Sequence, residues 1–264
     1  MMLPHSTYAL LLAGLLLLRP AEDVDTMLAF VENAGQQMHD FGSGVTWERY
    51  TAFEDESEKR AGTLVIEGQG RERKISLLFN QYAPSKGAGD ELRRHYIYGD
   101  GWVTEIDERN KSFTKRQVSE PGKDFDPLKL GEGPIPLPFG QTAAEVKAVF
   151  DVELCGPSPL PLFRSLGDTI GLCLRPKPYT PMARNADLVE LFYDKTTFVL
   201  RGANMVKANG DRSSFLLVRP AVNTGLTPDQ QRLLVLPNPD PREWQIDIRR
   251  WEDAGGVQVP SPGS

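Results

Sequence analysis

The sequence predicts a mainly β protein: an antiparallel sheet of about eleven strands, with a helix before the sheet and at least one helix inserted in it. Three observations lead to this class. Short segments alternate apolar and polar residues with a period of two, turn residues separate them, and few stretches show the 3.6-residue period of a helix. Most connections are too short for parallel crossovers, so neighbouring strands are expected to run antiparallel.

The composition argues against several classes of function. The chain has 264 residues and a formal net charge of −6, with three histidines and two cysteines. Nucleic-acid binding needs clustered cations that replace phosphate counterions, and the acidic balance argues against it. So few histidines and cysteines leave little material for a zinc cluster or a Cys/His catalytic site. We therefore expect no enzymatic activity, no metal, no cofactor and no nucleic-acid partner, and we expect a monomer.

The amino terminus has the features of a signal peptide. Residues 8–18 form a leucine-rich run without charge, too short to span a membrane but typical in length of the apolar region of a signal peptide. We expect residues 1–21 to be removed by cleavage near Ala21; a retained anchor is the alternative, because no Lys or Arg precedes the run. Residues 22–251 then form a single domain, and the Gly/Pro/Ser-rich residues 252–264 a disordered tail.

The two cysteines, Cys155 and Cys173, have two open interpretations. In an oxidising compartment they could pair and close a loop of roughly 18 residues, which stabilises the fold by about 3 kcal/mol in the chain-entropy model. They could equally remain free, buried thiols that pack as small apolar side chains.

After the leader, a helix and a series of hairpins are expected. Apolar residues recur on one face of residues 25–38, which predicts an amphipathic helix, and Gly42 is placed to end it. From Val45 the period changes to two. The expected strands of this part, separated by turn residues, are Val45–Phe53, Gly62–Glu67, Arg73–Tyr82, Leu92–Tyr98, Trp102–Asp107 and Ser112–Val118.

A proline-rich loop over residues 119–140 precedes the second series of elements. Thr142 and Glu145 form a capping box that starts a helix over residues 142–150. Asn209-Gly210 is typical of a tight hairpin turn. The expected later elements are strands at Asp151–Leu154, Thr169–Arg175, Leu188–Tyr193, Phe198–Lys207, Arg212–Arg219 and Trp244–Trp251, and a short helix at Thr227–Leu233.

The most informative feature for function is an excess of apolar residues at alternate positions of the strands. Because alternate residues point to one side of a strand, these residues are expected to share one concave face. They are Leu64, Ile66, Ile75, Leu77, Phe79, Tyr96, Tyr98, Trp102 and Phe113. Either the helices complete an ordinary core on this face, or they cover a cavity that admits an apolar guest. In the second case Met27, Val31 and Met38 of the first helix form the lid, because methionine adapts to guests of variable shape.

The polar residues do not suggest a catalytic centre. His95 lies inside an alternating strand and is interpreted as structural. The carboxylates Glu54, Glu56 and Glu58 lie in a charged run that is interpreted as a solvated loop. We therefore identify no catalytic residue.

Three blocks of the chain resemble the LolA-like periplasmic carriers of the outer-membrane lipoprotein-sorting superfamily. They are the turn and strand Tyr98–Asp107, the proline-rich crossover with the following helix over residues 124–150, and the late strands around Leu191–Lys195 and Asn209-Gly210-Asp211. The resemblance covers roughly residues 25–235. An Arg-Pro pair that latches the lid in the carrier proper is absent here, where the strand ends Glu67-Gly68-Gln69-Gly70.

The resemblance implies a fold and a function. The expected fold is a half-open antiparallel β-barrel with a helical lid, whose apolar inside holds the acyl chains of a lipoprotein or lipid. The expected role is a periplasmic carrier for transfer towards the outer membrane, with an inner-membrane donor complex and an outer-membrane acceptor as partners. The alternative is an envelope sensor or protein-binding module on the same fold, without lipid transfer.

Overall fold

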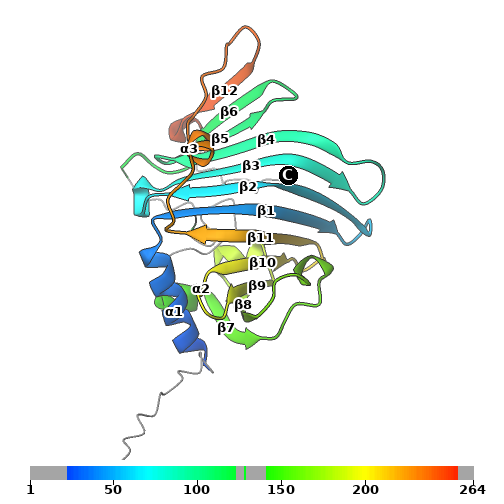
Figure 1. The fold of residues 1–264 in the computed structure, drawn as a ribbon, viewed down its shortest axis with the longest axis vertical. Helices are drawn as coiled ribbons and strands as arrows, with labels where there is room; N and C mark the ends of the chain where they lie inside the picture. Colours follow the sequence, from blue (N-terminus) through cyan, green and yellow to red (C-terminus); the bar gives the residue numbers. More distant parts are fainter. Residues whose placement is uncertain (1–22, 123–127, 129–140, 255–264) are drawn as a thin grey trace, which may run out of the picture.

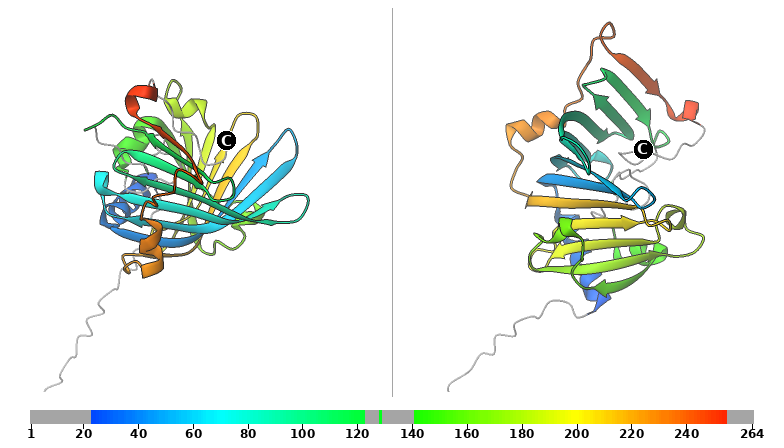
Figure 2. Two further views of the ribbon diagram at one scale, coloured as in Figure 1. Left: turned by 90° about the horizontal axis from the view of Figure 1, so that it is seen from above. Right: turned by 90° about the vertical axis from the view of Figure 1, so that its right-hand side faces the viewer.

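A computed structural model describes residues 23–122, 128 and 141–254, and twelve strands in this part of the chain form one sheet. The strand order is β12-β6-β5-β4-β3-β2-β1-β11-β10-β9-β8-β7. The sheet curls around a concave face, and its edge strands β12 and β7 are not paired with each other within the described residues (Figures 1 and 2). The predicted half-open barrel is thereby confirmed, with twelve strands in place of about eleven.

The strands agree with the sequence pattern in order and differ mainly at their ends. They are β1 (Asp40–Thr51), β2 (Glu56–Glu67), β3 (Lys74–Pro84), β4 (Asp90–Gly99), β5 (Trp102–Asp107), β6 (Ser112–Gln117), β7 (Phe150–Cys155), β8 (Thr169–Pro176), β9 (Leu188–Asp194), β10 (Leu200–Val206), β11 (Arg212–Val222) and β12 (Gln245–Arg249).

Two expectations about the strands were wrong. The charged residues Glu56 and Glu58 belong to β2, because β2 continues well beyond the apolar segment from which it was recognised. In addition, β12 runs parallel to β6, whereas all the other pairs are antiparallel. The chain leaves β11 in the middle of the sheet and reaches its far edge through a long connection, so a hairpin does not dictate the direction of β12.

Some expectations fall outside the described residues. These are the leader 1–21, most of the proline-rich loop 119–140 and residues 255–264. Within the range expected as a disordered tail, residues 252–254 belong to the 3-10 helix η4 (Trp251–Ala254).

The α-helices begin at the side-chain caps that the sequence contains. They are α1 (Val24–Gln37), α2 (Ala143–Val149) and α3 (Pro228–Leu233). Asp23 caps α1 by accepting a hydrogen bond from the Thr26 amide, and Thr142 and Glu145 form the predicted capping box of α2. No helix in the described part of the chain has both the length and the apolarity to cross a membrane.

The end of α1 is fixed to the sheet on two sides. The Gln69 side chain, in the turn after β2, donates to the carbonyl of Gln36 at 2.9 Å. The Asn223 side chain, just after β11, donates to the carbonyl of Gln37 at 2.8 Å. Helix α1 also meets α2, where the Ala143 amide donates to the Glu32 carboxylate at 2.9 Å. Both helices therefore lie together at the end of the sheet where β1 begins (Figure 1).

Cys155 and Cys173 form a disulfide that joins the edge strand β7 to β8, with α-carbons 5.7 Å apart. Cys155 lies opposite Gly171 in the register of the two strands. A β-carbon on Gly171 would lie 2.7 Å from the Cys155 carbonyl oxygen and 3.0 Å from its sulfur. Glycine at this position therefore leaves room for the bridge.

Replacing both cysteines by serine is expected to lower the free energy of unfolding by about 3 kcal/mol, because the bridge closes a loop of 18 residues in the unfolded chain. Urea unfolding of the Cys155→Ser/Cys173→Ser variant measures this loss, and the wild type with a reductant should lose the same amount. Equal unfolding midpoints for variant and wild type would contradict the prediction.

Candidate functional site

Seven of the nine residues expected on the concave face lie there together. They are Leu64, Ile66, Ile75, Leu77, Phe79, Tyr96 and Tyr98, all between 0 and 4% exposed and all in the main apolar cluster. The register explains the grouping, because Leu64, Leu77 and Tyr96 are direct cross-strand neighbours on β2, β3 and β4. One continuous apolar surface therefore crosses these three strands.

Trp102 and Phe113 do not share this face. The turn between β4 and β5 pairs Tyr98 with Val103, so Val103 joins the main cluster and Trp102 points to the outer side of the sheet. Phe113 packs on that outer side in a separate small cluster with Ile97 and Ile106. The expectation failed because alternation within a strand does not say which parity follows a turn.

The residues expected in the lid adjoin the apolar face. Met27 and Met38 are buried in the same cluster as Leu64 and Leu77, and Val31 is half-buried against that cluster. The structure thus places α1 and the residue after it over the end of the concave face where β1 begins.

Two aromatic residues that were not expected on the concave face, Trp47 and Phe215, extend it. Trp47 on β1 lies with its ring centroid 6.0 Å from Phe79 on one side and 6.0 Å from Phe215 on the other. Its indole N–H donates to the Ser213 hydroxyl at 2.7 Å. The sequence did contain a signal for Trp47, because it alternates with Val45 on the expected strand. Both residues are buried in the structure.

Charged side chains occupy the same concave face farther from α1. We call this set the polar band: Glu58, Arg60, Arg94, Glu105 and Asp107. Arg60 contacts Glu58 at 3.1 Å, and Arg94 contacts Asp107 at 2.9 Å and Glu105 at 3.7 Å. The polar band lies towards the ends of the strands opposite to α1, because Asp40 begins β1 beside α1 and Glu56 begins β2 at the opposite end.

The apolar surroundings shift the ionisation of groups in and beside this band. Burial, together with the nearby Glu105 carboxylate, raises the pKa of Tyr96 to about 12. Burial opposes ionisation of Asp107, but hydrogen bonds from the Asn110 amide and from Arg94 outweigh it and lower the pKa of this carboxyl group. At neutral pH the concave face therefore holds a neutral phenol beside paired charges.

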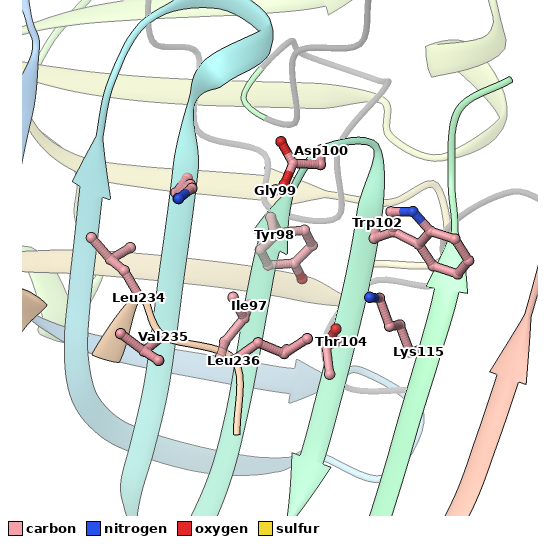
Figure 3. Close-up of a pocket in the computed structure, with 11 residues that line it drawn as sticks. Ile97, Tyr98, Gly99, Asp100, Trp102, Thr104, Lys115, Leu234, Val235 and Leu236 are labelled. Atoms are coloured by element: carbon pink, nitrogen blue, oxygen red, sulfur yellow. The ribbon is translucent and has the colours of Figure 1, made fainter. Parts of the chain in front are cut away.

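The outer side of the sheet carries a groove of about 330 Å³ under the segment that follows α3 (Figure 3). Leu234, Val235 and Leu236 form one wall, with Ile97 and Thr104 of the sheet beneath them. Val235 is 66% and Leu236 40% exposed. The ammonium group of Lys115 lies 4.8 Å from the centre of the Trp102 ring, another part of the lining. This groove presents apolar side chains to solvent beside a cation.

His95 holds this outer segment to the sheet. Its Nε2 atom lies 2.7 Å from the Ser76 hydroxyl, and its ring makes a hydrogen bond with the backbone of Leu233. Burial lowers the pKa of His95 to about 4, so the ring is neutral at pH 7. The interpretation of His95 as a structural residue agrees with these contacts.

A further groove, of about 680 Å³, lies between α1, the β9–β10 hairpin and the end of β11. Phe30 of α1 stacks on Phe198 there with ring centroids 4.6 Å apart. No group of three or more metal-ligating side chains occurs among the described residues.

No protein-family model matches this chain, and no curated protein does. Solved structures similar to it include an uncharacterized conserved protein from Thermus thermophilus, with 14% identity, 84% of this chain and 97% of that chain covered, and a TM-score of 0.46. A chain of the Pseudomonas aeruginosa MucA/MucB complex has 16% identity, 78% and 59% coverage and a TM-score of 0.43.

A LolA superfamily protein from Nitrosomonas europaea is also similar, with 10% identity, coverage of 80% of this chain and 97% of that chain, and a TM-score of 0.30. Members of the superfamily that the sequence resembles are thus among the similar solved structures. At these identities the likeness is one of fold alone.

Acid is expected to destabilise the protein through His95. The unfolded chain binds the proton with a pKa near 6.5 and the folded chain with a pKa of about 4. As the pH falls, the unfolded state therefore gains the proton first. The free energy of unfolding decreases by about 3 kcal/mol between pH 7 and pH 4. In the His95→Gln variant this part of the pH dependence should disappear. Urea unfolding of both proteins at neutral pH and near the folded-state pKa checks this, and identical pH dependence in both would contradict it.

Proposed function

We propose that this protein is a periplasmic carrier that binds the acyl chains of a lipoprotein or lipid on the concave face of the sheet. The observation that carries the proposal is the division of that face. A continuous apolar surface adjoins α1 and the polar band lies beyond it, so one surface offers contacts to both parts of an amphipathic molecule. The sheet is open at its edges in the described residues, which leaves a side through which a chain could enter.

The location and partners belong to the same proposal. The disulfide is of the kind that persists in oxidising compartments, and the leucine-rich leader suits export to one. A carrier between two membranes takes its load from an inner-membrane donor complex and gives it to an outer-membrane acceptor. Binding and release require no covalent step, so we propose no enzymatic activity.

Replacing Leu77 by Trp tests whether the apolar face binds a guest. Leu77 is 1% exposed at the centre of the face, whereas Leu78 of the same strand points to the outer side. If the face accommodates acyl chains, Leu77→Trp should fill the space and weaken binding of a fluorescent fatty-acyl probe at least tenfold. Leu78→Trp, the matched control, should leave binding unchanged.

Thermal unfolding of both variants separates a binding face from an ordinary core. Overpacking of a filled core costs about 1–3 kcal/mol. Unchanged probe binding by Leu77→Trp together with a large fall in melting temperature would mean that the face is core, and the carrier proposal would fall.

The outer groove favours a second candidate, a protein-binding module of the cell envelope. Exposed Val235 and Leu236 beside Trp102 and Lys115 form a surface suited to an apolar peptide segment with acidic flanks. A photoreactive residue in place of Leu236 should then give one discrete protein adduct in the native envelope. The same residue in place of Phe53, which is 98% exposed in the turn after β1, should not. Equal labelling at both positions would argue against this candidate.

A further inference from the structure

Within the part of the chain that the structure describes, Arg60 on β2 has buried donor groups without acceptors. The residue is 9% exposed, and its Nη2 atom donates to Glu58 at 3.1 Å. Its Nε and Nη1 atoms are inaccessible and make no hydrogen bond to any of the described residues. A guanidinium group remains charged at any physiological pH and offers five N–H donors. Leaving such donors unsatisfied in a buried position is costly, so the site is suited to an incoming acceptor.

The surroundings of Arg60 hold its side chain in place. The guanidinium carbon lies 4.8 Å from the centre of the Trp47 ring, and Trp47 is the direct cross-strand neighbour of Arg60 on β1. On the other side, Tyr82 of β3 is opposite Arg60 in the register. The guanidinium plane is therefore positioned by stacking, while two of its nitrogen atoms lack acceptors among residues 23–122, 128 and 141–254.

Arg60 stands at the boundary between the apolar surface and the polar band. On β2 the residues that face inward after it are Gly62, Leu64 and Ile66, and Leu64 and Ile66 belong to the main apolar cluster. Trp47, which stacks on Arg60, is itself in contact with Phe79 of that cluster. A hydrocarbon chain lying against Leu64 and Leu77 in the direction of the strands would therefore end beside Arg60.

The charge balance indicates the kind of acceptor. Glu58 pairs with Arg60 and Asp107 pairs with Arg94, and Glu105 adds a third carboxylate beside these two guanidinium groups, so the band offers hydrogen-bond donors without excess positive charge. An uncharged carbonyl oxygen can therefore serve as well as a carboxylate. Where an acyl chain meets its head group, an ester carbonyl and a carboxylate both supply an sp² oxygen atom that can accept a hydrogen bond.

We infer that Arg60 is a binding residue for the carbonyl or carboxyl oxygen at the head of an acyl chain that lies on the concave face. This inference rests on the proposed function and adds the direction of the guest: its chain points towards α1 and its head towards the polar band. Binding requires the guest to displace the side chains that cover Nε and Nη1 in the free protein.

A pair of probes that differ only in the carbonyl group tests the inference. A long-chain methyl ester and an alkyl methyl ether of the same length are titrated into the full chain, with the fatty acid as a third probe. The wild type should bind the ester about tenfold more tightly than the ether, because only the ester offers a carbonyl acceptor to the charged donor. The fatty acid shows whether the carboxylate is preferred to the ester.

Two variants localise the effect. Arg60→Met keeps an unbranched side chain against Trp47 but has no donor, so it should bind ester and ether equally and bind the ether as the wild type does. Arg93→Met is the matched control, because Arg93 is exposed, pairs with Glu108 and lies outside the concave face. It should retain the full preference for the ester.

Each outcome bears on one of the two proposals. Equal affinity of the wild type for ester and ether would overturn the role of Arg60 while leaving acyl binding intact. Equal weakening of both probes by Arg60→Met would show a merely structural role and overturn the inference as well. If neither probe nor the fatty acid binds to the wild type, the carrier proposal falls and the inference falls with it.

Discussion

The structure depends on one constraint, the cross-strand register that places apolar residues of successive strands on the same face. Phe41, Ile66, Ile75, Tyr98 and Val103 form one row across β1 to β5, and every residue of this row is buried. A slip of one residue in any pair would turn the inward residues of a strand outward. Only this register produces a continuous apolar face for α1 to cover.

An irregularity in the register of β2 and β3 lies between the apolar surface and the polar band of the concave face. Between β2 and β3 the pairing shifts at Phe79 and Gln81, so β3 carries one extra residue there. A β-carbon on Gly62, at this shift, would lie 1.8 Å from the Leu78 carbonyl oxygen, so the strands approach too closely for any other residue. The bulge restores Tyr82 to the concave side opposite Arg60. The polar band and the apolar row therefore share one surface despite the change of register.

Much of the fold was predictable because local chemistry determines it. The capping box of Thr142 and Glu145 involves only residues three positions apart, so the start of this helix can be recognised locally. Alternation likewise identifies a strand such as Lys74–Pro84 without knowledge of its partners. The failures concern relations between strands. Trp102 follows a turn that sets its side of the sheet, and β12 finds a partner far from it in the sequence. Arg60 was missed because it precedes the apolar segment Gly62–Glu67 from which the strand was recognised, and the charged residues just before it suggested a solvated loop.

The pairing of β1 with β11, which we call the seam, joins two parts of the sheet. It brings together strands that are far apart in the sequence. Apart from the parallel pair β12–β6, neighbouring strands on either side are close in sequence, whereas the seam pairs Val45 near the beginning with Leu217 near the end. Contacts between distant residues form slowly, because the intervening chain must first be brought together. A chain that emerges amino terminus first therefore keeps one edge of β1 unpaired until β11 has been made. During that interval the row that begins at Phe41 ends at an unpaired strand edge, and the nascent protein is most exposed to aggregation.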